Sequence, residues 1–154
     1  MAWRLLHAGV HLRSRRQVIE GATLALVEEQ VKILRELSEA LGILNVEQLG
    51  LDIFVTIRRH RDQKAYVLRF RCDGWPVQPA SVLFVDPVAK EDSGPEVWPS
   101  DGEQAIKRNA IPRFICIPGT REYLAHHGPV QPTIHRIALA VVLQQVIQCI
   151  EARG

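Results

Sequence analysis

The chain contains little cysteine and no long apolar run. Its three cysteines, Cys72, Cys116 and Cys149, are far apart and odd in number, with no closely spaced pair among them. This pattern argues against a disulfide framework and a zinc site, and it favours a reducing compartment. No segment approaches the ~18 apolar residues that a membrane span needs, and the first dozen residues lack the apolar core of a secretory signal. We therefore expect a cytoplasmic protein with no membrane partner.

The sequence also carries little excess charge. Its net charge is +2 and its isoelectric point is near 8.6, which is too mild to imply a nucleic-acid partner. Basic residues cluster at positions 13–16 and 58–61, and we interpret the second cluster as a solvated turn between strands in preference to a phosphate-binding patch. A Gly-rich nucleotide loop and metal-ligand spacing are both missing from the sequence, so we predict no cofactor and no metal.

The length of 154 residues predicts one domain spanning residues 1–154, with residues 1–14 as an irregular or weakly helical N-terminal extension. A helix is predicted over residues 16–41, because apolar residues recur there at steps of three and four and Gly42 is a natural stop. The apolar stripe of this helix consists of Leu24, Val27, Val31, Leu34, Leu37 and Leu41.

Three strands are predicted next. Apolar and polar residues alternate over residues 51–58 and again over residues 66–72, and a short polar turn at residues 59–64 joins the two runs. A turn at Asp73 and Gly74 leads to a third, apolar strand at residues 82–85. The short connections imply antiparallel pairing of neighbours.

The second half of the chain begins with a Pro- and Gly-rich loop over residues 86–112, in which residues 103–108 could form a helical turn. An extended piece is expected at residues 113–117, a turn at residues 126–129 and a final helix over residues 133–152. The order of elements predicts an α+β domain, with helices packed on one face or end of an antiparallel sheet.

Two motifs in this order resemble the ubiquitin-conjugating enzyme superfamily, in particular its divergent bacterial branch. One is an aromatic residue with two prolines before a strand, and the other is an apolar residue directly before a cysteine. The first motif consists of Trp75-Pro76, Gln78-Pro79 and the strand residues Val82-Leu83-Phe84. The second motif is Phe114-Ile115-Cys116. The resemblance implies an N-terminal helix, an antiparallel β-meander, a long active-site loop and a C-terminal helix.

The resemblance also implies a function. Cys116 would accept a ubiquitin-like protein as a thioester from an activating enzyme, and would pass it to an amine-bearing target protein. Relatives of this kind suggest a role in antiviral defence. The family's His-Pro-Asn tripeptide is absent here, and Asn109 stands one position away from the spacing of that asparagine.

The position of Cys116 after the long loop, together with the resemblance, makes it the candidate nucleophile. Sulfur suits the task, since a thiolate attacks carbonyls near neutral pH and the resulting thioester stays reactive toward amines. The reaction also needs a donor for the oxyanion and an acceptor for the amine proton. Candidates for these roles are Asn109, Arg121, Tyr123, His126 and His127. We expect Cys72 and Cys149 to lie in the core, because both stand in register with apolar neighbours.

Three alternatives remain open. The first is a conjugating-enzyme-like binding module that holds a ubiquitin-like protein or an activating enzyme without transfer. The second is a cysteine phosphatase, but only four residues separate Cys116 from Arg121 and no helical pattern begins directly after Gly119. The third is a Cys-His hydrolase using His126, His127 or His135 with an orienting carboxylate.

Overall fold

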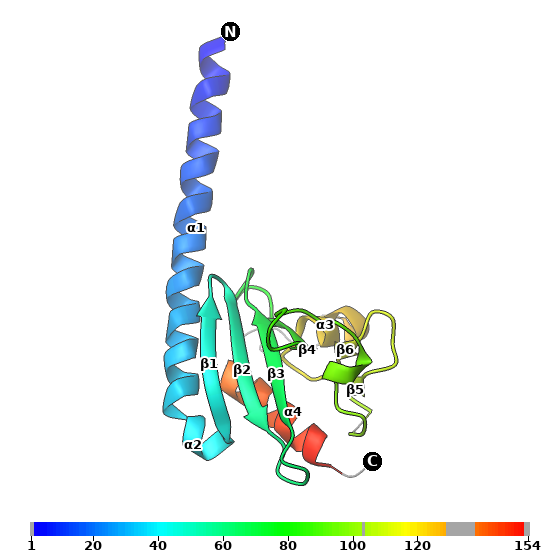
Figure 1. The fold of residues 1–154 in the computed structure, drawn as a ribbon. Helices are drawn as coiled ribbons and strands as arrows, with labels where there is room; N and C mark the ends of the chain where they lie inside the picture. Colours follow the sequence, from blue (N-terminus) through cyan, green and yellow to red (C-terminus); the bar gives the residue numbers. More distant parts are fainter. Residues whose placement is uncertain (1, 103, 129–137, 153–154) are drawn as a thin grey trace.

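The computed structural model describes the chain apart from residues 1, 103, 129–137 and 153–154, with side chains described from Arg15 onward. The helical elements are α1 (Ala2–Glu36), α2 (Ser38–Leu41), the 3-10 turn η1 (Pro95–Val97), α3 (Arg121–His127) and α4 (Leu139–Glu151). The strands are β1 (Ile43–Leu49), β2 (Asp52–Arg58), β3 (Ala65–Arg71), β4 (Ser81–Val85), β5 (Ile106–Lys107) and β6 (Phe114–Ile115). This is the α+β arrangement that the sequence predicts, with an N-terminal helix, an antiparallel sheet and a C-terminal helix (Figure 1).

Strands β1 to β4 form one antiparallel sheet in the order β1-β2-β3-β4. The three strands expected from the sequence are confirmed as β2, β3 and β4. Their register places Val55 opposite Leu68 and Leu68 opposite Phe84. These three residues, and every second residue from them along each strand, therefore share one face of the sheet. The apolar members of this set point to one side of the sheet.

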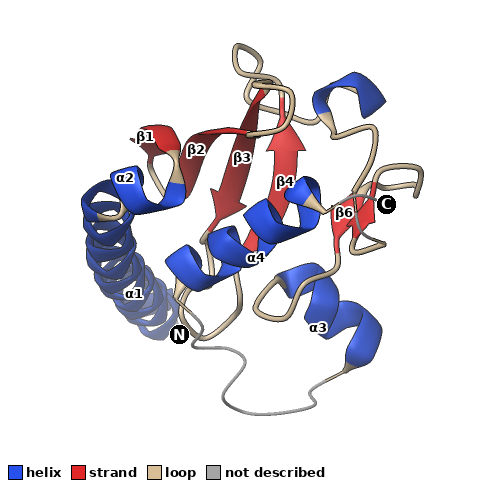
Figure 2. Cartoon of the chain, turned by 90° about the horizontal axis from the view of Figure 1, so that it is seen from below, coloured by secondary structure: helices blue, strands red, loops and turns tan. Residues whose placement is uncertain are grey.

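Helices α1 and α4 cover that side, as the view along the sheet shows (Figure 2). From α1 come Val27, Val31 and Leu34, all buried against the strands. The two helices also meet each other, because the side-chain oxygen of Gln30 accepts a hydrogen bond from the backbone N–H of Leu139 at 3.1 Å. The core contributed by the sheet and α4 consists of Ile53, Val55, Ile57, Tyr66, Leu68, Phe70, Val82, Phe84, Leu139, Val142, Leu143, Val146 and Ile150.

The N-terminal helix differs from its prediction at both ends. Of the two expectations for residues 1–14, the irregular one is wrong for the described residues and the helical one holds, because α1 begins at Ala2 and runs for 35 residues. It ends at Glu36, and the single turn α2 completes the expected span before Gly42, which adopts the predicted left-handed conformation with φ of 67°. Leu24 and Leu37, placed on the apolar stripe by the sequence, are 36% and 38% exposed and therefore do not belong to the core.

Strand β1 was not predicted. Only Ile43 and Val46 of its seven residues are buried, and they are three positions apart instead of two. The pairing with β2 shifts between Ile43 and Asn45, which is a bulge that interrupts the alternation. A strand with such a bulge carries no period of two for sequence reasoning to find.

The region after β4 contains more regular structure than expected. The helical turn predicted at residues 103–108 is wrong, since Ile106–Lys107 pair with Phe114–Ile115 as a two-stranded hairpin. The extended piece at residues 113–117 is confirmed in part by β6. The turn predicted at residues 126–129 is also wrong where it is described, because His126 and His127 end helix α3.

The final helix is confirmed from Leu139 to Glu151, and the beginning of its prediction, residues 133–137, lies outside the described residues. Cys149 is buried as expected, whereas Val141 is exposed. Among the helices described, none combines the length and the apolarity required to cross a bilayer.

Candidate functional site

Cys116 lies directly after β6, where the chain alternates between core and surface. Ile115 and Ile117 are 0% and 3% exposed, while Cys116 between them is partly exposed. The backbone N–H of Cys116 donates a hydrogen bond to the carbonyl of Ala105 at 2.8 Å, which extends the β5–β6 pairing by one step. Two buried neighbours and one ladder bond therefore fix the thiol at the surface.

Thr120 connects this strand to helix α3. Its side chain is fully buried, and its hydroxyl donates to the carbonyls of Ile115 at 3.1 Å and Ile117 at 2.8 Å. The same oxygen accepts the backbone N–H of Tyr123 at 3.1 Å, which makes Thr120 the N-cap of α3. One hydroxyl thus couples the position of Cys116 to the direction of α3. A threonine directly before a helix is a sequence signal for this cap, but the signal can be recognised only if a helix is already expected there.

His127 is the predicted site residue that reaches Cys116. Its Nε2 lies 3.5 Å from the Sγ of Cys116, within hydrogen-bonding range for sulfur. The imidazole stacks on the ring of Tyr123, one helical turn earlier, with ring centroids 4.3 Å apart. This stack holds the imidazole beside the thiol, so α3 supplies both the ring that reaches Cys116 and the ring that supports it.

His126 has a different environment, although it is adjacent in sequence. Its Nδ1 donates a hydrogen bond to the carbonyl of Glu122 at 2.8 Å, and its ring stacks on Phe114 at 4.5 Å with an interplanar angle of 12°. Neighbouring residues on a helix point about 100° apart, so only one of the two histidines faces the sulfur. His126 instead fastens α3 onto β6 from the other side.

Arg121 points away from the thiol. Its guanidinium pairs with Asp73 and donates to the carbonyl of Pro79 at 3.3 Å. The pairing holds the pKa of the Asp73 carboxyl below its ordinary value, through the hydrogen bond from Arg121. Contrary to expectation, a helix does begin soon after Gly119, but the arginine that a phosphatase loop would turn toward phosphate is occupied by Asp73.

Asn109 is not brought to the thiol. It is exposed in the turn of the β5–β6 hairpin, beyond Lys107, whereas Cys116 stands opposite Ala105 at the other end. Asn109 instead lines a cavity of about 270 Å³ between the hairpin and Asp101 of the preceding loop. The register of the hairpin therefore separates the asparagine from the sulfur.

The other two cysteines are confirmed in the core. Cys72 is fully buried, and burial raises the pKa of its thiol to about 12. Cys149 is 8% exposed on the inner side of α4. Cys116 is thus the most accessible thiol in the protein.

The long loop before the site is held at two carboxylates that sequence reasoning missed. The first is Asp92, which accepts hydrogen bonds from the Trp98 indole at 3.1 Å and from the Arg113 Nε at 2.9 and 3.1 Å. Arg113 immediately precedes β6, so this ion pair ties the start of the loop to the strand that leads to Cys116. Isolated Asp and Arg residues far apart in a sequence give no signal of such a pair.

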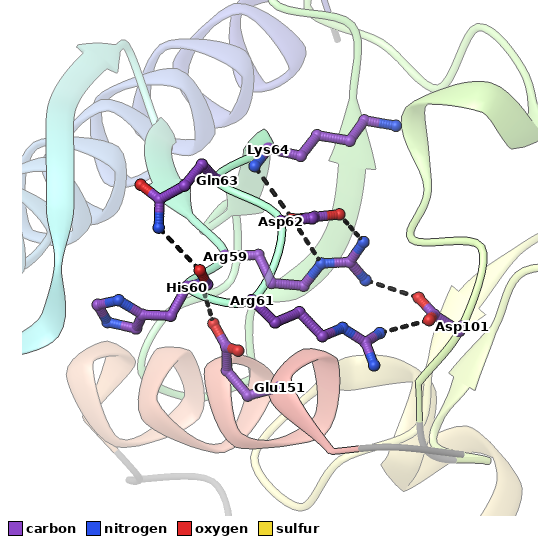
Figure 3. Close-up of polar contacts among 8 residues, drawn as sticks. All are labelled: Arg59, His60, Arg61, Asp62, Gln63, Lys64, Asp101 and Glu151. Carbon is purple, nitrogen blue, oxygen red and sulfur yellow. Dashed lines mark hydrogen bonds and ion pairs between the residues drawn. The ribbon is translucent and has the colours of Figure 1, made fainter.

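The second carboxylate is Asp101, which accepts from Arg59 at 2.7 Å and pairs with Arg61 at 2.5 Å (Figure 3). Arg59 also pairs with Asp62, and its guanidinium is buried. The sequence-based interpretation of this cluster as a solvated turn is therefore wrong for Arg59. These cations are satisfied by two carboxylates, which leaves them unsuited to phosphate.

The same turn is bound to the end of the chain's last helix. The backbone N–H of His60 donates to the carboxylate of Glu151 at 2.5 Å (Figure 3). The β2–β3 turn, the loop at Asp101 and α4 are thus joined within one polar network. This network lies near the hairpin that precedes Cys116, so it supports the framework of the site without entering it.

Comparison of the sequence with protein families and with curated proteins finds no match in either. Within the described ranges, no group of three or more His, Cys, Asp and Glu side chains is arranged to hold a metal ion. His135, named for the hydrolase alternative, lies outside the described residues. The candidate site is therefore the Cys116–His127 pair with Tyr123 and Thr120 around it.

Proposed function

We propose that this protein is a ubiquitin-conjugating-type acyl transferase, which accepts a ubiquitin-like modifier as a thioester on Cys116. The observation that carries the proposal is the 3.5 Å contact between the Cys116 Sγ and the His127 Nε2. The order of an N-terminal helix, a four-stranded antiparallel meander and a cysteine on a segment after a long loop supports it, since the ubiquitin-conjugating resemblance implies that order. The partners are an activating enzyme, the modifier and an amine-bearing target.

Loading is a thioester exchange. His127 takes the proton of the Cys116 thiol, and the thiolate attacks the carbonyl carbon of the modifier's thioester on the activating enzyme. A new carbon–sulfur bond forms, the bond to the activating enzyme's sulfur breaks, and that sulfur leaves as a thiolate that takes up a proton. The partly exposed thiol suits this step, because the incoming sulfur must reach it from solvent.

Transfer completes the cycle. The amine of the target attacks the same carbonyl carbon, a carbon–nitrogen bond forms and the bond to Cys116 breaks. His127, which lies beside the leaving sulfur, accepts the proton that the attacking amine loses and passes it to the Cys116 thiolate. His126 takes no part in either step, because its ring is held on Phe114.

A thioester-loading assay tests the proposal directly. The protein is incubated with ATP, a cognate activating enzyme and a ubiquitin-like protein, and the mixture is separated without reductant. We expect a thiol-sensitive adduct that is lost in Cys116→Ala and retained in Cys72→Ala and Cys149→Ala, while Cys116→Ser traps a thiol-resistant ester. Failure to form any adduct with an activating enzyme that is itself charged would refute the enzymatic function.

The role of His127 is tested by comparison with its neighbour. His127→Gln removes the base, whereas His126→Gln keeps a side chain that can still donate to the Glu122 carbonyl. We expect His127→Gln to slow loading, and alkylation of Cys116 by iodoacetamide, by about 10²-fold, within the range for a lost general base. Equal effects of the two substitutions would contradict the assignment of the base to His127.

One observation favours the binding module as a second candidate. Asn109, the residue nearest to the family's oxyanion-stabilising asparagine in sequence, lies in the far turn of the hairpin. A module would bind the modifier or the activating enzyme with equal affinity in the native chain and in Cys116→Ala, and would form no adduct. The loading assay therefore separates the two candidates.

A further inference from the structure

Helix α1 extends far beyond the domain that it helps to build. At 1.5 Å per residue, its 35 residues measure about 52 Å. Among the side chains of α1 that the structure describes, from Arg15 onward, the buried ones lie between Val27 and Leu34. Figure 1 shows the N-terminal part projecting past the sheet as a free arm.

The described part of this arm has a solvent-exposed surface that is too apolar for a free helix. From Arg15 to Leu26 the side chains are exposed, apart from the half-buried Thr23. Among them, Val18 and Ile19 are 71% and 66% exposed, and Leu26 is 39% exposed. Gly21 lies in the middle of the arm and costs about 1 kcal/mol of helix stability relative to alanine. An unsupported helix of this composition is marginal in water, so the arm needs a partner to remain helical.

The apolar residues follow a seven-residue repeat. Leu5, Leu12, Ile19, Leu26 and Ile33 recur at intervals of seven along the chain. Of the members whose side chains are described, Ile19 and Leu26 are exposed, and Ile33 packs at the edge of the core. Residues seven positions apart lie on nearly the same side of an α-helix, so Ile19 and Leu26 form an exposed apolar line that a second helix would cover.

The distribution of charged residues along α1 indicates what kind of partner the arm would bind. The residues before Glu20 include Arg4, Arg13, Arg15 and Arg16 and no acidic residue. The residues from Glu20 to Glu36 carry four glutamates against two basic side chains, and are thus net acidic. The helix is therefore complementary to itself when reversed, with a basic half that matches an acidic half.

We propose that α1 pairs with α1 of a second copy of this chain, antiparallel, so that each basic arm lies along the acidic half of its partner. Two such contacts related by a twofold axis form one closed, isologous dimer. This inference is independent of the proposed catalytic function.

The pairing leaves the thiol accessible. Helix α1 contacts β1, α2 and α4, whereas the strand that carries Cys116 contacts β4, β5 and α3. Since β1 and β4 are opposite edges of the sheet, the dimer contact and the thiol lie on different sides of the domain. Each copy would present its own Cys116.

Sedimentation equilibrium of the full chain over micromolar to millimolar concentration tests the dimer. We expect a monomer–dimer equilibrium whose dissociation constant rises about tenfold or more, equivalent to at least 1.4 kcal/mol, in Ile19→Glu and in Leu26→Glu. Gln17→Glu is the matched control, because it adds the same charge to the same helix about 200° away from Ile19 and should leave the constant within twofold. The exposed positions keep the domain folded, which circular dichroism and thermal unfolding confirm in each variant.

The salt dependence of the dissociation constant distinguishes an antiparallel from a parallel pair of helices. An antiparallel pair weakens as salt screens the attraction between basic and acidic halves, whereas a parallel pair would strengthen as salt screens repulsion between like halves. A chain that stays monomeric throughout, or a dimer as sensitive to Gln17→Glu as to Ile19→Glu, would overturn the proposed contact. A dimer that tightens with salt would overturn its antiparallel arrangement.

Discussion

Replacing Thr120 by valine tests whether one buried hydroxyl holds the candidate site together. The substitution keeps the branching of the side chain and exchanges its hydroxyl for a methyl group, which forms no hydrogen bond. In the native protein the hydroxyl oxygen caps α3 through the Tyr123 N–H and donates to the carbonyls of Ile115 and Ile117. Valine leaves the helix without its cap and both carbonyls with one partner fewer.

The cost follows from these contacts. Loss of an N-cap costs about 1 kcal/mol, and depriving a buried group of its partner costs about 1–3 kcal/mol. The Ile117 carbonyl keeps the backbone N–H of Thr120 at 3.0 Å, so most of the second cost falls on the Ile115 carbonyl. We expect Thr120→Val to lower the free energy of unfolding by about 2 kcal/mol.

Urea unfolding followed by tryptophan fluorescence measures this loss, since Trp75 and Trp98 are buried. Thr120→Ser is the control, because it keeps the oxygen and loses one buried methyl group, at about 0.8 kcal/mol. The reasoning is refuted if serine destabilises the protein as much as valine does. A frayed α3 should also move His127 from the sulfur, so Thr120→Val should slow alkylation of Cys116 while serine preserves its rate.

Three further predictions concern the rest of the molecule. In the folded protein at about pH 8, iodoacetamide should label Cys116 and spare Cys72, because burial raises the pKa of the Cys72 thiol to about 12. Mass spectrometry that found Cys72 labelled first would contradict its place in the core. Because hydrogen bonds from Arg59 hold the pKa of Asp101 below its ordinary value, the ion pair stabilises the fold above about pH 4 and is lost as the pH falls toward the lowered pKa. Arg59→Met should therefore flatten the decline of unfolding free energy on acidification, and an unchanged slope would argue against the Arg59 network. Gly42→Ala should cost about 1 kcal/mol through backbone strain alone, since φ is 67° and no atom lies within 4 Å of an added Cβ; urea unfolding that showed no loss would exclude that strain.

Sequence reasoning succeeded where burial on one face imposes a period on the chain. The alternation in β2 and β3 and the stripe containing Val27, Val31 and Leu34 were predicted and are found in the core. It failed at β1, whose bulge breaks the alternation, and at the arm of α1, where no tertiary contact marks the helix.

The candidate site was predictable in its residue types and not in its geometry. The cysteine on an extended piece was found, but the two adjacent histidines could not be told apart while residues 126–129 were read as a turn. A seven-residue helix is too short to show a periodic pattern, and its N-cap, Thr120, is recognisable only from the bonds that it makes. The placement of Asn109 depends on the register of a hairpin with only two residues in each strand.

The alternation of Ile115, Cys116 and Ile117 has a consequence for how this segment can change. The chain reaches the surface at one residue between two that are buried, so the sulfur faces outward only while the alternation from Ile115 to Ile117 is kept. The turn between Lys107 and Phe114 can change in length without altering that alternation, because loops tolerate insertions. A single residue inserted between Ile115 and Cys116 would instead bury the thiol and turn Ile117 outward. The length of this short segment is therefore under tighter constraint than the length of the turn before it.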